Sequence, residues 1–203
     1  MTTQTPTPDW DDAVPAAERL AVRCTDSDCD ADLHCFKQTR QMAAKGAPRG
    51  ECRSCHERLV ELDRTCERRP GDRPYLLESL RKELIRHHFW HLPFDQDALD
   101  RAARRGRHGL HEAAEKRLRT YVGRAEPFRD GTQTPLSGNA IFYAQHATAS
   151  CCRTCVEYWH GIPKGRPLDD DEIAYLHGLV VGYLDERLPN LADDPVRVPR
   201  RPR

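Results

Sequence analysis

Two clusters of cysteine and histidine constrain most strongly how this chain can fold. Six of its nine cysteines lie between residues 24 and 66, and the other three lie between residues 146 and 165 together with two histidines. Only 38% of the 203 residues are hydrophobic and 32% are charged, so an apolar core alone would be thin. Thiolate and imidazole are the ligands that zinc prefers, and a bound ion can stabilise a chain with a small core. The sequence therefore predicts zinc-stabilised structure, with one or two sites.

The cysteines are expected to be ligands or free thiols rather than partners in disulfides. Their number is odd, and residues 1–9 contain neither the basic nor the apolar region of a secretory signal. No run approaches the ~18 apolar residues that a membrane-spanning helix requires. We therefore expect a protein of the reducing cytoplasm that has no membrane partner.

The spacing of the first cluster is typical of a zinc finger. Cys24 and Cys29 form one short pair, and Cys52 and Cys55 form a second pair 22 residues later. Four such ligands suit a tetrahedral ion, and a helix that begins at the second pair would resemble a treble clef. The alternative is a set of buried free thiols. Any of four further residues can replace a chosen ligand: His34, Cys35, His56 and Cys66.

The second cluster offers a second metal site. In a helix over residues 152–160, Cys152 and Cys155 share a face, as do Cys151 and Cys155, so the two adjacent cysteines are not expected to serve equally. The preferred ligands are His146, Cys152, Cys155 and His160. Because His160 lies about 80° round the helix from Cys152, it can also miss the ion. Three protein ligands would then leave an open position, which favours hydrolysis or deamination.

Thiol chemistry is a further hypothesis for the same residues. A cysteine at a helix N-terminus has a lowered pKa and can act as a nucleophile when a histidine accepts its proton. The candidate catalytic residues are therefore His146, Cys151 and His160. Gln145 and Arg153 are expected to assist as polar groups.

Hydrophobic periodicity predicts a mainly helical protein. The predicted helices cover a segment within residues 30–45, a segment after Cys55, residues 75–91, a helix that Asp95 or Asp97 caps and that runs to about Gly106, residues 109–123, 140–147 and 152–160, and a last helix after Asp169. Glu172 lies three residues after Asp169, as in a capping box. We expect a zinc-finger-like module over residues 18–70 and a helical domain over residues 75–190. Residues 1–17 and the basic tail 191–203 are predicted to be disordered.

Charge is unevenly distributed along the chain, although the net charge is zero. Residues 36–129 hold 22 basic and 14 acidic side chains, a net charge of +8. This middle region can contact nucleic acid, or it can be an ordinary solvated helical surface. The sequence leaves both interpretations open.

Three runs in the second half of the chain resemble the DUF4186 family of uncharacterised bacterial and archaeal proteins. They are residues 130–135 (DGTQTP), 145–155 (QHATASCCRTC) and 159–165 (WHGIPKG), and the resemblance covers about residues 100–188. It implies that the 130–135 loop belongs to the same site as the second cluster, and it implies no reaction. The chain departs from the family at Ala113, where members often have a histidine, since His111 is out of register. The finger-like module is an addition.

Two functional hypotheses follow. The first is a metal-stabilised module that binds nucleic acid or another protein. The alternative is a metal-dependent or thiol enzyme centred on residues 146–160. An open metal position in a cleft would favour the enzyme, and a closed, dry site would favour the module.

Overall fold

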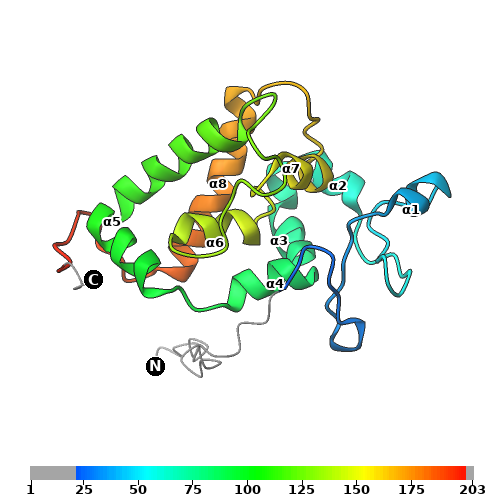
Figure 1. Ribbon diagram of the computed structural model, residues 1–203, viewed down its shortest axis with the longest axis horizontal. Helices are drawn as coiled ribbons and strands as arrows, with labels where there is room; N and C mark the ends of the chain where they lie inside the picture. The colour runs from blue at the N-terminus through cyan, green and yellow to red at the C-terminus, as the bar shows by residue number, and fades with distance from the viewer. Residues whose placement is uncertain (1–21, 200–203) are drawn as a thin grey trace.

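The computed structural model describes residues 22–199, and within that range it contains eight α-helices and isolated β-bridges but no β-strand (Figure 1). The predicted mainly helical fold is confirmed, while the predicted disorder of residues 1–17 lies outside the described range. None of the described helices is long and apolar enough to span a membrane. The helices are α1 (Arg40–Ala44), α2 (Leu62–Cys66), α3 (Arg73–Arg81), α4 (Leu84–His91), α5 (Gln96–Arg117), α6 (Ala140–Ala147), α7 (Arg153–His160) and α8 (Asp170–Arg187).

Four helices form the main core. Helix α6 is buried along almost its whole length, and it packs between α4, α5 and α8. The apolar stripes of these neighbours contribute Ile85, Leu110 and Val180, among others, to one continuous cluster. A helix that is apolar on all sides is stable only when it is covered on all sides. The sequence that carries the 145–155 run is thus held rigidly inside the domain.

The N-terminal residues pack onto the helical domain through a second core. Phe36, Val60 and Leu62 are buried there against Leu80 and Trp159. In Figure 1 the cyan part of this N-terminal segment, which includes α2, lies beside α3 and α7. The finger-like segment and the helical domain therefore share apolar side chains instead of touching only through polar surfaces.

The single helix predicted over residues 75–91 is two helices, α3 and α4. The backbone of His34 pairs with the residues that join the two helices. Its N–H donates to Lys82 O at 2.8 Å, and its carbonyl accepts from Leu84 N at 2.9 Å. Glu83 consequently has extended backbone angles and forms a parallel bridge with His34. A tertiary contact overrides the helical periodicity here.

Two predicted helix starts are confirmed, and one predicted helix is wrong. The capping box of Asp169 and Glu172 is present, and the Asp95 side chain caps α5 by accepting from Ala98 N. The helix predicted directly after Cys55 is wrong, since residues 56–61 are not helical and α2 begins only at Leu62. No helix therefore begins at Cys52 and Cys55, which is the feature that would have resembled a treble clef.

Helix α5 contains a sharp break at Gly106, close to the predicted helix end. Gly106 has φ of 68° and ψ of 173°. Residues 191–199, which we predicted as part of a disordered tail, run along this break: Arg107 N donates to Ala192 O and Val196 N donates to Ala103 O, both at 2.8 Å. A side chain at Gly106 would collide with this segment, because its Cβ would lie 2.5 Å from Asp193 O.

Replacing Gly106 should therefore destabilise the fold. We expect Gly106→Ala to lower the free energy of unfolding by about 2–4 kcal/mol, because it combines a left-handed φ with a backbone collision. Gly109→Ala in the same helix is the matched control. Its Cβ would meet only Arg105 Cβ at 3.6 Å, and alanine should stabilise the helix by about 0.5–1 kcal/mol. Urea denaturation measures both, and equal stability of the two variants would contradict this account.

Candidate metal centres

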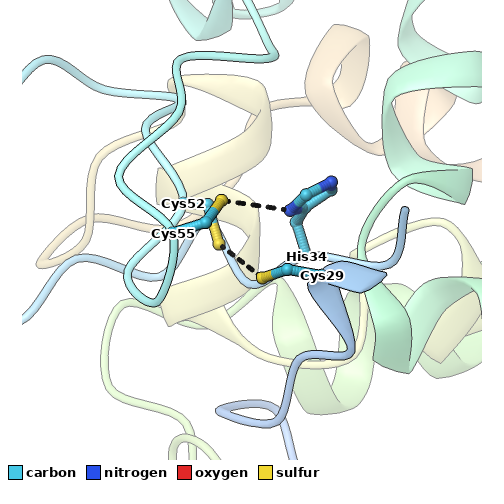
Figure 2. Close-up of side chains that lie close together, drawn as sticks. All are labelled: Cys29, His34, Cys52 and Cys55. Carbon is cyan, nitrogen blue, oxygen red and sulfur yellow. Dashed lines mark hydrogen bonds between the residues drawn. The ribbon is translucent and has the colours of Figure 1, made fainter. Parts of the chain in front are cut away.

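The first candidate centre consists of Cys29, His34, Cys52 and Cys55. One potential ligand atom from each residue lies within 4.8 Å of the others. Figure 2 shows the four side chains converging from two separate turns of the chain. An antiparallel bridge flanks each turn, between Asp28 and Leu33 in one and between Glu51 and Arg58 in the other. The four side chains thus come from two turns, each closed by its own bridge.

The spacing of these atoms fits a tetrahedral ion. Cys29 Sγ lies 3.8 Å from Cys52 Sγ, and Cys55 Sγ lies 3.6 Å from His34 Nδ1. A tetrahedron with zinc–sulfur bonds of about 2.3 Å has edges of about 3.8 Å. Four protein ligands leave no position open, so this centre has the form of a structural site.

Neighbouring polar groups orient these ligands. Asp32 Oδ1 lies 3.0 Å from His34 Nε2, which leaves Nδ1 to face the sulfur atoms. Burial opposes ionisation of Cys52, but backbone N–H groups, including that of Ser54, lower the pKa of its thiol to about 6. A thiolate is therefore favoured at the position where a metal needs one.

Four candidates from the first cluster lie outside this group. Cys35 is buried and donates to Cys24 O, His56 pairs with Glu51, and Cys66 lies beside Arg49. Cys24, a member of the ligand set predicted from spacing, faces the second centre instead. His34 stands in its place. Sequence spacing named His34 only as a substitute, because the turn that brings it round is formed by a tertiary contact with residues 82–84.

The second candidate centre consists of Cys151, Cys152 and Cys155, whose sulfur atoms all lie within 4.8 Å of one another. Helix α7 begins only at Arg153, and Cys152 is its N-cap residue, with Sγ accepting from Cys155 N at 3.4 Å. Cys151 and Cys152 thus lie in the turn before the helix. The expected conflict between adjacent cysteines does not arise, because that expectation assumed helical geometry for both.

A buried arginine lies against these thiols. Arg86 is 2% exposed, and its Nη2 lies 3.1 Å from Cys155 Sγ while its Nη1 lies 3.7 Å from Cys151 Sγ. The same guanidinium donates to Glu83 Oε2 at 2.9 Å, and Glu83 also accepts from Trp159 Nε1. Contacts with the thiols of Cys151 and Cys152, together with the Arg86 charge, hold the pKa of Cys155 well below its usual range. Positive charge therefore favours a thiolate at Cys155, whereas the pKa values of the neighbouring Cys151 and Cys152 thiols are raised.

The three cysteines line a pocket of about 500 Å³. One wall comes from the N-terminal segment and includes Cys24, Lys37 and Arg49. Gly131 and Thr134 of the 130–135 loop also line the pocket, as the family resemblance implies. The pocket thus lies at the junction of the finger-like segment and the helical domain, a common place for ligand sites.

The two histidines of the predicted site lie outside the 4.8 Å group. His160 is fully buried, with Nδ1 3.0 Å from Tyr175 Oη and Nε2 3.0 Å from Thr148 O. His146 lines the pocket, and its Nε2 lies 3.2 Å from the carbonyl oxygens of both Thr134 and Pro135. Both histidines therefore have one ring nitrogen committed to a backbone carbonyl.

The two predicted polar helpers contact neighbouring segments of the chain, although Nε and Nη1 of Arg153 are buried without a hydrogen-bond partner among the described residues. Gln145 donates to Ser150 O and accepts from Arg117, and the Arg153 guanidinium donates to the carbonyls of Pro163 and Arg166. Neither side chain is exposed. They shape the loops around the centre, and neither is among the residues that line the pocket.

Comparison with protein families identifies the family to which the matched segment belongs. The sequence model of DUF4186, a domain of unknown function, matches residues 74–185. No solved structure matches the chain. The matched segment contains the second candidate centre with Glu83 and Arg86, whereas the ligands of the first centre all precede it.

Thiol alkylation distinguishes the two ligand sets from the remaining cysteines. In zinc-loaded protein we expect iodoacetamide to spare the six ligand cysteines, and also Cys35 because it is buried, and to modify the partly exposed Cys24 and Cys66. Peptide mass spectrometry reads the modified positions, and a chelator should expose the six, which are Cys29, Cys52, Cys55, Cys151, Cys152 and Cys155. The assignment would be contradicted if the metal protected Cys24 from alkylation and any of these six cysteines were modified in the zinc-loaded protein.

Acid should destabilise the protein partly through His160. Burial lowers the pKa of His160 from 6.5 to about 4. Between these values the unfolded chain binds a proton that the folded protein excludes, so the free energy of unfolding falls as pH falls through this window, by on the order of 3 kcal/mol. Denaturation at several pH values should show a shallower dependence for His160→Gln than for the wild type. Parallel profiles would contradict the prediction.

Proposed function

The chain belongs to the DUF4186 family of domains of unknown function, and from its site we propose that it is a metal-dependent enzyme of the hydrolase or deaminase type. The observation that carries this proposal is the convergence of Cys151, Cys152 and Cys155 on the wall of a 500 Å³ pocket. Among the described residues, no fourth ligand atom belongs to that group. Three ligands beside a pocket are the arrangement of catalytic zinc sites, whereas structural sites have four.

The contrast with the first centre supports this division of roles. Its four ligands fit a closed site that stabilises the N-terminal turns and leaves no position for a ligand from solution. The second centre lies at the start of α7 beside Arg86 of α4, and Phe89, Val156 and Trp159 near it already belong to the two apolar clusters. Stabilisation alone therefore does not explain three convergent thiols there.

Arg86 supports a metal at the second centre. A divalent ion held by three thiolates has a net charge of −1, and a buried guanidinium in contact with two of the sulfur atoms offsets that charge. A metal ion held there would act as a Lewis acid on a ligand in the pocket. We propose zinc at both centres, since zinc accepts sulfur and nitrogen ligands in tetrahedral form. We also propose a cytoplasmic location, since the ligand thiols must stay reduced.

The nucleic-acid partner predicted for residues 36–129 remains a prediction. Several arginines of that region are engaged by acids. Arg107 pairs with Asp185 and Asp193, and Arg119 pairs with Glu115 and Asp170. Such pairing reduces the charge available to phosphates, so we rank the binding module second.

Cobalt substitution tests the proposal, because thiolate-bound Co²⁺ has a visible spectrum that depends on coordination. We expect two equivalents in the wild type, one in Cys52→Ser and one in Cys152→Ser. Azide should change the cobalt spectrum of the wild type and of Cys52→Ser by occupying the open position, and it should leave that of Cys152→Ser unchanged. A spectrum that no small anion alters would show that both centres are closed and would overturn the enzyme proposal.

A further inference from the structure

We propose that His146 Nδ1 accepts a hydrogen bond from the ligand of the pocket, and that this ligand is a small molecule with an N–H or O–H group adjacent to its metal-binding atom. The inference rests on the proposed open centre at Cys151, Cys152 and Cys155. It adds the chemical class of the ligand and the residue that recognises it.

The surroundings of His146 determine where its proton lies. Nε2 faces two backbone carbonyls, Thr134 O and Pro135 O, each at 3.2 Å. Carbonyl oxygens only accept hydrogen bonds, so Nε2 must carry the proton. In a neutral imidazole Nδ1 then has a lone pair and no proton. The 130–135 loop thus fixes one tautomer of His146.

Nδ1 of His146 is buried and has no hydrogen-bond partner among the described residues. The side chain as a whole is buried, since the residue is 6% exposed. An unsatisfied buried acceptor costs about 1–3 kcal/mol, and native proteins rarely leave one. His146 lines the pocket that holds the three cysteines. A donor on a bound ligand is therefore the partner that this atom lacks.

His160 provides the comparison within the same protein. Its Nε2 also faces a backbone carbonyl, that of Thr148, but its Nδ1 has the Tyr175 hydroxyl at 3.0 Å as partner. His160 is absent from the pocket lining. The two histidines thus differ: Nδ1 of His160 has a protein partner, whereas Nδ1 of His146, a residue of the pocket lining, has none among the described residues.

The imidazole of His146 is held in a fixed position relative to the thiols. It stacks on Phe89 with ring centroids 4.6 Å apart and planes 17° apart. Arg86 Nη1 donates to His146 O at 2.7 Å, and the same guanidinium contacts Cys151 and Cys155. A ligand bound to a metal at the three cysteines and to His146 therefore contacts groups whose relative positions are set by these hydrogen bonds and by the stacking on Phe89.

The remaining lining sets further limits on the ligand. Burial and the Arg86 charge lower the pKa of His146 to about 4, so Nδ1 remains an acceptor at neutral pH. Lys37 also lines the pocket and has no ion-pair partner among the described residues. Amides, hydroxamates and hydroxy acids have the required N–H or O–H group, and a negative charge on the ligand would be attracted by Lys37.

Two probe ligands separate the role of His146 from the presence of an open centre. Acetohydroxamate binds metals and has N–H and O–H groups, whereas azide binds metals and has no donor. In cobalt-loaded protein we expect His146→Phe, which keeps an aromatic ring against Phe89, to weaken acetohydroxamate binding about 5- to 50-fold, the range for one buried hydrogen bond. Azide binding should change less than twofold. His160→Gln is the control, and both probes should retain their wild-type affinities for it.

The outcomes are distinct. Equal changes for the two probes in His146→Phe, or no change for either, would overturn the role of His146 while leaving the open centre intact. Failure of both probes to alter the wild-type cobalt spectrum would overturn the proposed function and this inference with it. Nitrogen-15 NMR of the wild-type zinc protein gives an answer even if His146→Phe does not fold. The Nδ1 resonance should move with acetohydroxamate and remain in place with azide, and a stationary resonance would overturn the proposal.

Discussion

The hydrogen bonds of the buried Arg86 guanidinium are the interactions on which the rest of the structure depends. A charge buried without partners costs several kcal/mol, so its surroundings must supply acceptors in fixed positions. Arg86 has three kinds of acceptor: the Glu83 carboxylate, the His146 carbonyl, and the sulfur atoms of Cys151 and Cys155. These belong to the α3–α4 break, to α6 and to the start of α7. One side chain therefore fixes the relative positions of three elements that surround the pocket.

The first candidate centre contributes to placing this guanidinium. The ring of His34 belongs to that centre, and its backbone forms the bridge that interrupts the α3–α4 helix at Glu83. The interruption begins α4 at Leu84 and places the Glu83 carboxylate within 2.9 Å of Arg86 Nε. Loss of a metal from the first centre would thus loosen the strand-like contact that positions Glu83. The two clusters, although separate in sequence, are mechanically connected through one histidine and one glutamate.

Local sequence signals predicted much of this fold, and non-local contacts account for the remainder. Apolar periodicity indicated the helices, and the Asp169–Glu172 spacing indicated the last helix start, because these signals act within one or two turns. The α3–α4 break was not predicted, since it depends on His34, about fifty residues away. The same contact explains why His34 replaces Cys24 in the first group. Helical geometry predicts that Cys151 and Cys152 do not serve equally as ligands, whereas Cys151 lies in the turn before α7 and its sulfur joins the group.

Polar groups inside this protein distinguish structural from functional positions better than residue type does. Histidine occurs in the first centre, in the lining of the pocket and in the core. His34 has Asp32 and three sulfur atoms as neighbours, and His160 has two hydrogen-bond partners. A well-packed apolar side chain can often replace a buried ion pair at little cost to stability. The region around Arg86 instead keeps a buried guanidinium, a buried carboxylate and three thiols beside a pocket. A ligand in the pocket that interacts with these charges and sulfur atoms would account for their burial there. We therefore expect chemistry at the second centre and not at the first.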